Sequence, residues 1–270
     1  MLTVAHMLPL TLIQTGIRKW DCAAFAILYV ITAHAVSLSL HRYFAHRSFR
    51  TSRLFQFCLA LLACSIFGDP VWFAGKHRLH HKNSDTSADV HTPLQGLWHC
   101  WIGSVLDNGY TREEVWSYAR DWSRFPELRF LSRFFYLPGI VAAGTVYVIG
   151  GYRMFVTGYC LAFLVALHGS SAVNYLCHRK GYRRFATPDL STNNLLLGYL
   201  FFGEGWHNNH HSHPSSATFG YAWYEIDLVY FSIMLLAKAG LIWHVNTISG
   251  ANGLSGRFIA DGTHVLERAG

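Results

Sequence analysis

Long apolar stretches separated by short polar segments dominate this chain. Residues 22–40, 134–152 and 155–173 are apolar and close to the roughly 20 residues that a helix needs to cross a bilayer. Residues 54–75 are equally apolar apart from Asp69. The pattern predicts an all-α, integral membrane helical bundle with about four transmembrane helices.

The two ends of the apolar pattern are less regular. Residues 1–16 are apolar but short, which predicts a truncated span or an interfacial helix. Residues 226–243 are long enough to span, but Asp227 and Lys238 make an interfacial helix at least as good an interpretation. We find no repeat or long linker, so we expect one folded unit over residues 1–270.

Composition agrees with a membrane protein. Hydrophobic residues make up 51% of the chain, charged residues only 14%, and the mean hydropathy is +0.20. The six cysteines show no C-x-x-C spacing and mostly lie in apolar stretches, which predicts free thiols.

Three histidine clusters are the candidate chemistry. In two of them the histidines recur at i, i+3 and i+4, so on a helix we expect their rings to share one face and converge on a common point. Neutral imidazole binds iron, zinc and copper. A structural zinc takes four ligands, so this many rings predicts two metal ions. The clusters are His41 and His46; His77, His80 and His81; and His207, His210 and His211.

The clusters constrain the topology. If residues 54–75 crossed the membrane, the first two clusters would lie on opposite faces and could not share a site. We therefore expect this stretch to enter and return, or to lie along the interface, with a break at Gly68-Asp69-Pro70.

Charge predicts which face carries the clusters. The loops opposite the clusters contain only Arg18, Lys19 and Arg153, so the positive-inside rule predicts a cytoplasmic cap. The basic residues flank hydrophobic spans, so nucleic acid is not expected as a partner. The basic residues on the cluster side are Arg42, Arg47, Arg50, Arg53, Lys76, Arg78, Lys82, Arg179, Lys180, Arg183 and Arg184.

The order H-x-x-x-x-H, H-x-x-H-H, H-x-x-H-H among hydrophobic spans resembles the membrane fatty-acyl desaturases of the delta-9 acyl-CoA type. The Gly203-Glu204-Gly205 lead into the third cluster and the Asn174-x-x-x-His178 pair also resemble that family, as does Asp89-Val-His91 after the second cluster. The resemblance covers roughly residues 20–245.

The resemblance implies a di-iron site with nine histidine ligands. It also implies that Asn174 contributes through a water molecule. The nine implied ligands are His41, His46, His77, His80, His81, His178, His207, His210 and His211.

Metal-bound imidazoles are commonly oriented by a carboxylate on their other nitrogen. Asp69, Asp85, Asp89 and Glu204 are the acids nearest the clusters, and Glu204, three residues before His207, is the first candidate. The substrate carbon must be held in a dry, apolar slot beside the metals. Trp72, Phe73, Phe44 and Trp206 are candidates for its walls.

Removing two hydrogens from unactivated methylenes needs a redox metal that activates oxygen, which favours two irons over zinc. The resemblance implies oxygen-dependent introduction of a cis double bond into a fatty-acyl chain linked to coenzyme A, a carrier protein or a lipid. An acetylenase or hydroxylase with the same histidine clusters is the alternative. A histidine-rich metal transporter is more distant, since transport paths place histidines in mid-span.

The sequence contains no haem-binding or ferredoxin-like segment. Electrons are therefore expected from a separate donor, such as a ferredoxin or a cytochrome with its reductase. The expected location is a bacterial inner membrane, surrounded by membrane lipid, with the active site on the cytoplasmic face.

Overall fold

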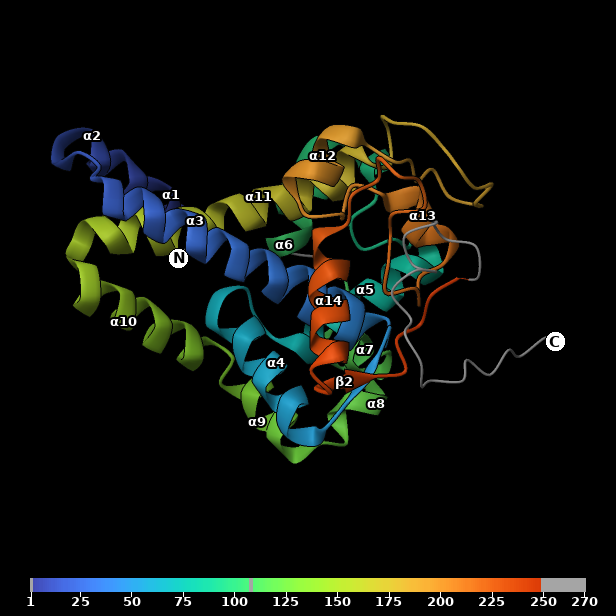
Figure 1. The fold of residues 1–270 in the computed structure, drawn as a ribbon. Coiled ribbons are helices and arrows are strands. Elements are labelled where there is room, and N and C mark those ends of the chain that lie inside the picture. Colours follow the sequence, from blue (N-terminus) through green and yellow to red (C-terminus); the bar gives the residue numbers. More distant parts are fainter. Residues whose placement is uncertain (1, 107–108, 249–270) are drawn as a thin grey trace.

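The computed structural model describes residues 2–106 and 109–248, and this part of the chain is mostly helical, as expected. Long helices extend to one side of the molecule, whereas short helices and loops gather on the other (Figure 1). Two short antiparallel strands, β1 (Arg50–Thr51) and β2 (Ile242–Trp243), join distant parts of the chain. Six short elements are α6 (Ser104–Leu106), α7 (Arg112–Ser117), α8 (Arg120–Ser123), α9 (Pro126–Arg133), α12 (Leu195–Leu200) and α13 (His207–Ser212).

The first long helix begins with a capped turn and ends in a wider one. Helix α3 (Lys19–His34) starts where the Asp21 carboxylate accepts the Arg18 backbone N–H at 2.8 Å. It continues directly as the π-helix η2 (Ala35–Ala45). Together they form a 27-residue apolar helix that is long enough to cross a membrane. His41 lies in the π-helical part, where wider turns commonly accompany functional sites.

The second apolar stretch is broken where the sequence predicts. Helices α4 (Arg53–Ile66) and α5 (Pro70–Asn83) meet at an angle of 86°. The Asp69 carboxylate accepts the backbone N–H groups of Val71 and Trp72, and Pro70 takes the first helical position, where no N–H is needed. Asp69 therefore starts α5, and the prediction that it orients an imidazole is wrong.

The third apolar stretch is a helical hairpin. Residues Tyr136–Leu176 form 41 nearly continuous helical residues, about 60 Å if straight. Gly151, inside α10 (Tyr136–Met154), interrupts them with a positive φ of 72°. The π-helix η5 (Phe155–Cys160) and α11 (Leu161–Leu176) follow α10 directly. In Figure 1, α10 runs away from α9 to the far side of the molecule, and α11 returns toward the side that carries α12 and α13.

Two helices are thus long and apolar enough to cross a membrane, Lys19–Ala45 and Tyr136–Leu176, or three if the bent pair α4–α5 is one broken span. The N-terminal segment folds as three short elements and is not among them. These elements are α1 (Leu2–Met7), η1 (Leu8–Thr11) and α2 (Leu12–Thr15).

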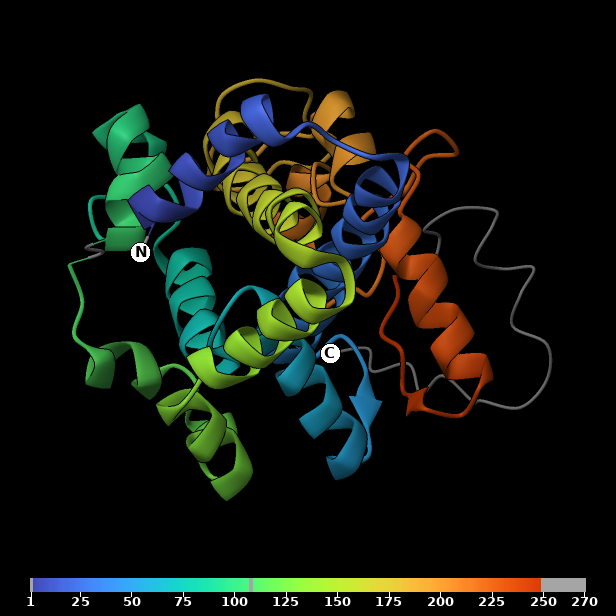
Figure 2. The same cartoon turned by 90° about the vertical axis from the view of Figure 1, so that its left-hand side faces the viewer.

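Helix α14 (Leu228–Lys238) has 11 residues, too few to span. It runs across the direction of α3 and α11 in Figure 1, and it lies at the right-hand edge of the helices in Figure 2. Phe231 and Leu235 are exposed on it, which supports the interfacial interpretation of this segment.

Two further short helices are η3 (Pro93–Gln95) and η4 (His99–Gly103). All six cysteines are free, as predicted.

Close packing holds α5 against α7. A Cβ atom added at Gly75 would lie 2.1 Å from the carbonyl oxygen of Val115, which is helix backbone and cannot move aside alone. We expect Gly75→Ala to lower the free energy of unfolding by about 1–3 kcal/mol. Thermal unfolding of the detergent-solubilised protein measures this. The control is Gly144→Ala in α10, where nothing lies within 4 Å. Equal melting temperatures for both variants would contradict the contact.

Candidate metal centre

Nine buried or half-buried histidines converge into two adjoining groups. Within each group, one ring nitrogen from every histidine lies within 4.8 Å of the others. The nine are the same residues that the sequence resemblance implies as ligands. The five-histidine group is His41, His46, His77, His81 and His210, and the four-histidine group is His80, His178, His207 and His211.

Each histidine-rich helix contributes to both groups. On α5, His77 and His81 join the five-histidine group, whereas His80 joins the four-histidine group. On α13, His210 joins the five-histidine group, whereas His207 and His211 join the four-histidine group. The physical reason is the helical repeat: positions i and i+4 differ by about 40° around the axis, whereas i+3 lies about 60° to the other side. The expectation that three rings of one helix converge on one point is therefore wrong.

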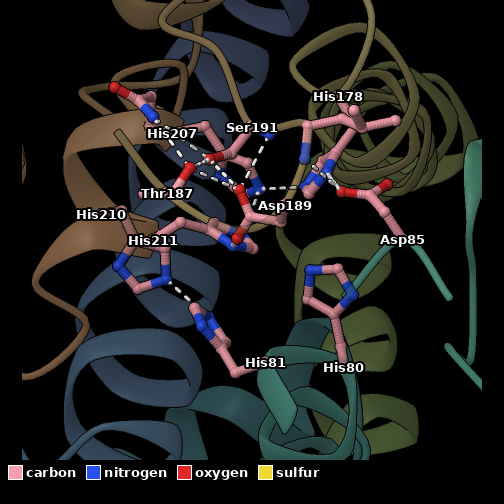
Figure 3. Close-up of polar contacts among 12 residues, drawn as sticks. His80, His81, Asp85, His178, Thr187, Asp189, Ser191, His207, His210 and His211 are labelled. Carbon is pink, nitrogen blue, oxygen red and sulfur yellow. Dashed lines mark hydrogen bonds and ion pairs between the residues drawn. The ribbon is translucent and has the colours of Figure 1, made fainter. Parts of the chain in front are cut away.

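The remaining three histidines come from the ends of the long helices. His41 lies near the end of η2, and His46 follows that helix directly. His178 comes just after α11, so the hairpin returns the chain to the site. Figure 3 shows His178 facing the α13 histidines, while His80 and His81 approach from α5. The ends of two long helices, helix α5 and the short helix α13 thus meet at one place.

The ring nitrogens face one another at distances that suit a shared cation. The Nε2 atom of His210 lies 2.9 Å from the Nε2 atoms of His41 and His81. In the other group, the Nε2 atom of His207 lies 3.1 Å from that of His178 and 3.0 Å from that of His211. Nitrogen ligands bind a transition metal at about 2.1 Å, so two ligands at right angles lie about 3.0 Å apart.

The proton positions on the rings also favour a cation between the histidines of each group. His178 and His211 each donate Nδ1–H to a carboxylate, so both present an unprotonated Nε2 to His207. His207 can donate one proton at most. The Nε2 atoms of His46 and His80 are buried and make no hydrogen bond within the described part of the chain. A cation in each group would satisfy these lone pairs, so the residues fit the metal ions that the sequence predicts.

Burial keeps the α13 imidazoles neutral. Desolvation, reinforced by the neighbouring histidines, lowers the pKa of His207, His210 and His211 well below the usual value. Neutral imidazole is the form that binds a metal ion. The three rings are therefore in the binding form at neutral pH.

Four carboxylates orient histidines of the two groups. The Nδ1 atoms of His80, His178 and His211 lie 2.8, 2.7 and 2.8 Å from Asp89, Asp85 and Asp189, respectively. In the five-histidine group, Nδ1 of His41 lies 2.6 Å from Glu204. Such contacts fix the ring orientation and make the other nitrogen a better ligand.

Three of these acids are among the sequence candidates, but the pairing of Glu204 is unexpected. Glu204 contacts His41, which is 163 positions away in the chain, and not the nearby His207. The sequence does not predict that Asp189 orients His211, because the two residues are 22 positions apart and Asp189 belongs to no motif. Figure 3 shows it among Thr187, Ser191 and the α13 histidines.

Arg42 is fully buried behind His41. Its guanidinium donates to Glu204 at 3.1 Å, to Asp227 at 2.7 Å and to the Ala217 carbonyl at 2.9 Å. It also stacks over the Phe219 ring, 3.8 Å from the centroid. Arg42 therefore does not contribute to the charge of the surface. Counting it among the basic residues that indicate the cytoplasmic face is wrong.

The charge of Glu204 is stabilised by this environment. Burial alone would raise the pKa of Glu204, but His41, Arg42 and Ser37 lower it to about 2. Glu204 is therefore ionised at neutral pH and can accept the proton of His41 Nδ1. The chain from Arg42 through Glu204 to His41 links a buried cation to the five-histidine group.

A cavity of about 320 Å³ leads to the two groups. Its walls come mainly from α3, η2, α5 and α11, and His41, His77 and His207 are among the residues that line it. Trp72 and Phe73 line it as predicted.

Phe44 and Trp206 do not line this cavity. Phe44 is buried against Trp122, with ring centroids 5.1 Å apart. The Trp206 indole donates to the Ile226 carbonyl at 2.9 Å and packs at Gly198. Both are core residues, and their prediction as slot walls is wrong.

The fold and the site define a mostly helical protein whose apolar helices lead to two histidine groups that could hold metal ions. The sequence model described as "Fatty acid desaturase" matches residues 19–242. The chain is 38% identical over 225 residues to "Acyl-CoA C20 Delta5-desaturase" of Anemone leveillei, covering 82% of this chain and 72% of the relative. It is 35% identical over 232 residues to "sn-1 stearoyl-lipid 9-desaturase" of Anabaena variabilis, covering 84% and 85%.

A third relative is named for a different lipid. The chain is 30% identical over 263 residues to "Palmitoyl-monogalactosyldiacylglycerol delta-7 desaturase, chloroplastic" of Arabidopsis thaliana, covering 96% of this chain and 71% of the relative. The chain belongs to the fatty acid desaturase family. It is an enzyme of the oxidoreductase class, as predicted.

Proposed function

We propose that the protein introduces a cis double bond into a fatty-acyl chain, using dioxygen and two irons held by the nine histidines. The observation that carries this proposal is the largely apolar cavity that His41, His77 and His207 help to line. The cavity brings a hydrocarbon chain next to two groups of neutral nitrogen ligands. The desaturase family supports the same reaction class.

The irons would supply oxygen activation, which removes hydrogen from unactivated methylenes. The protein supplies position and a dry environment. Apolar side chains such as Trp72 and Phe73 would hold the acyl chain still and exclude water, so that one pair of carbons faces the histidines. The carboxylates Asp85, Asp89 and Asp189 would fix the rings of the four-histidine group.

The arrangement of apolar helices supports a membrane topology. Helix α3 with η2, and the two arms α10 and α11, would each cross the bilayer, while α4 and α5 would enter and return at their 86° bend. Both histidine groups then lie on one face. Exposed Arg50, Arg179 and Lys180 on that side favour the cytoplasm. A bacterial inner membrane remains a prediction from the sequence.

The partners follow from the reaction. The substrate is a fatty-acyl chain, since relatives are named for acyl-CoA and for acyl lipids. Coenzyme A, a carrier protein or a glycerolipid could present it at the basic face. Electrons would come from a separate donor, such as a ferredoxin or a cytochrome with its reductase, which would dock on the same face.

Expression in a desaturase-deficient host tests the proposal. Lipid analysis should find a new cis monoene, and the purified protein should hold iron. The control is His178→Ala, which should yield neither. A hydroxylated product would identify a hydroxylase, and an alkyne formed from an alkene would identify an acetylenase. Zinc without any new lipid would support a transporter.

Asn174 offers a sharper test within the site. It lies one helical turn before His178 and lines the cavity. We expect Asn174→Ala to keep most of its iron but to turn over about 10- to 100-fold more slowly, because a metal-bound water would lose its partner. Iron content and product formation are measured on the same preparations.

The matched control for Asn174→Ala is Ser170→Ala, one turn earlier on the same cavity wall. Its turnover should stay near that of the wild type. If Asn174→Ala loses iron as completely as His178→Ala, the asparagine binds the metal directly and the water-mediated role is wrong.

A further inference from the structure

Within the described part of the chain, the cavity contains an ammonium group, that of Lys76, which has no carboxylate in ion-pair contact. Among the described residues that line it, Lys76 is the single lysine or arginine. Its Nζ donates to the Ser104 carbonyl oxygen at 2.8 Å, which uses one of its three N–H groups. No carboxylate of the described chain lies within 4.0 Å of this Nζ.

Both acids that line the cavity have other partners. Asp69 accepts the Val71 backbone N–H and the Ser132 hydroxyl, at 2.8 and 2.5 Å. Glu204 accepts from His41 and Arg42. The nearby Asp89 also exerts its negative charge on Lys76, but it is hydrogen-bonded to His80 at 2.8 Å and makes no ion-pair contact with the ammonium group.

A charge in apolar surroundings is unfavourable unless it is paired and hydrogen-bonded. The Ser104 carbonyl provides one partial negative charge, which leaves two N–H groups of Lys76 for a ligand that enters the cavity. A ligand with an oxygen acceptor at one end and a hydrocarbon chain at the other would satisfy both the ammonium and the apolar walls.

Resting on the proposed function, we propose that Lys76 binds the carbonyl or carboxylate oxygen of the fatty-acyl substrate and fixes how far the chain enters the cavity. Lys76 directly precedes His77 on α5, and both residues line the cavity. An oxygen held by Lys76 would thus lie at a fixed distance from the five-histidine group. The hydrocarbon would extend along the walls formed by Val36, Phe163 and Leu167.

An anchor at this place determines the register of the substrate. The number of methylenes between the oxygen and the irons is constant as long as the oxygen is held by Lys76. Without the charge, the chain can slide along apolar walls that bind each methylene equally. Lys76 is therefore a specificity-determining residue, and its loss should affect both substrate affinity and the position of the double bond.

Variants separate the charge from the hydrogen bond to Ser104. Lys76→Gln removes the charge but keeps a donor for the Ser104 carbonyl, whereas Lys76→Arg keeps the charge. Iron content and melting temperature of both variants should match the wild type, since Lys76 is in neither histidine group. These two measurements establish that the site is intact before binding is compared.

The binding probes are palmitate, methyl palmitate and hexadecane, which carry a carboxylate, an ester carbonyl and no oxygen. Against the iron-loaded protein, Lys76→Gln should weaken palmitate and methyl palmitate about tenfold or more, and Lys76→Arg much less. Hexadecane should bind all three proteins equally. Equal loss for hexadecane would mean that Lys76 only shapes the cavity, which overturns the proposal.

Product analysis gives the second readout. With palmitoyl-CoA as substrate, Lys76→Gln should raise KM more than it lowers kcat and should yield a mixture of double-bond positions. Unchanged affinity, KM and position would overturn the proposal while leaving the desaturase function intact. Charge-dependent palmitate binding by a wild type that forms no double bond would instead support this site and overturn the proposed function.

Discussion

His80→Ala and His210→Ala should each lose bound iron and all desaturation. His80 belongs to the four-histidine group and His210 to the five-histidine group. Each ring supplies a nitrogen that alanine cannot replace. Because the groups are distinct, we expect iron to fall from about two per chain to about one in each variant, and further if the remaining ion is held weakly. Iron analysis and lipid analysis on the same preparations measure both effects.

The matched control is His213→Ala. His213 follows α13 by one residue and packs against Phe185 and Tyr221, outside both histidine groups. Its iron content should equal that of the wild type. Wild-type iron content in His80→Ala or His210→Ala would show that the altered ring is not a ligand.

Local features of the fold could be predicted from the sequence because their causes are local. The break between α4 and α5 follows from three consecutive residues, of which Asp69 caps a helix and Pro70 fits its first position. The long apolar helices follow from composition over some 20 residues. The apolar ranges 134–152 and 155–173 predict the hairpin turn at residues 153–154, and the structure places the non-helical residue slightly earlier, at Gly151.

The candidate site was predictable as a set of residues but not as an arrangement. Spacing and family resemblance identify the nine histidines. They do not indicate that His80 points away from His77 and His81, because that depends on which neighbours α5 meets. The opposing helix α13 divides its histidines in the complementary way, and the two groups exist only when both helices are in place.

Contacts between distant segments account for what sequence reasoning missed. Asp189 reaches His211 from a loop, and Arg42 reaches Asp227 across 185 positions. Neither residue belongs to a spacing pattern. An arginine at the end of an apolar helix is ordinarily a surface charge, and only the fold reveals that two carboxylates surround it.

Arg42→Met should be the most destabilising of the substitutions considered. Arg42 is fully buried between Glu204 and Asp227, whose side chains are 13% and 3% exposed, respectively. Methionine fills much of the volume but leaves two carboxylates close together without a counterion. We expect a loss of about 3–5 kcal/mol in the free energy of unfolding, typical of breaking a buried ion pair. Thermal unfolding in detergent, with iron analysis, is the measurement.

The control for Arg42→Met is Arg53→Met. Arg53 also forms a bidentate pair, with both oxygens of Glu127 at 2.7 Å, but its side chain is 63% exposed. Its loss should therefore cost less than about 1 kcal/mol. Arg42→Met should also reduce iron in the five-histidine group, since Glu204 would no longer be held against His41. If both variants melt alike and retain iron, Arg42 neither stabilises the fold nor positions His41. If Arg42→Met melts early but keeps its iron, the ion pairs stabilise the core and Glu204 holds His41 unaided.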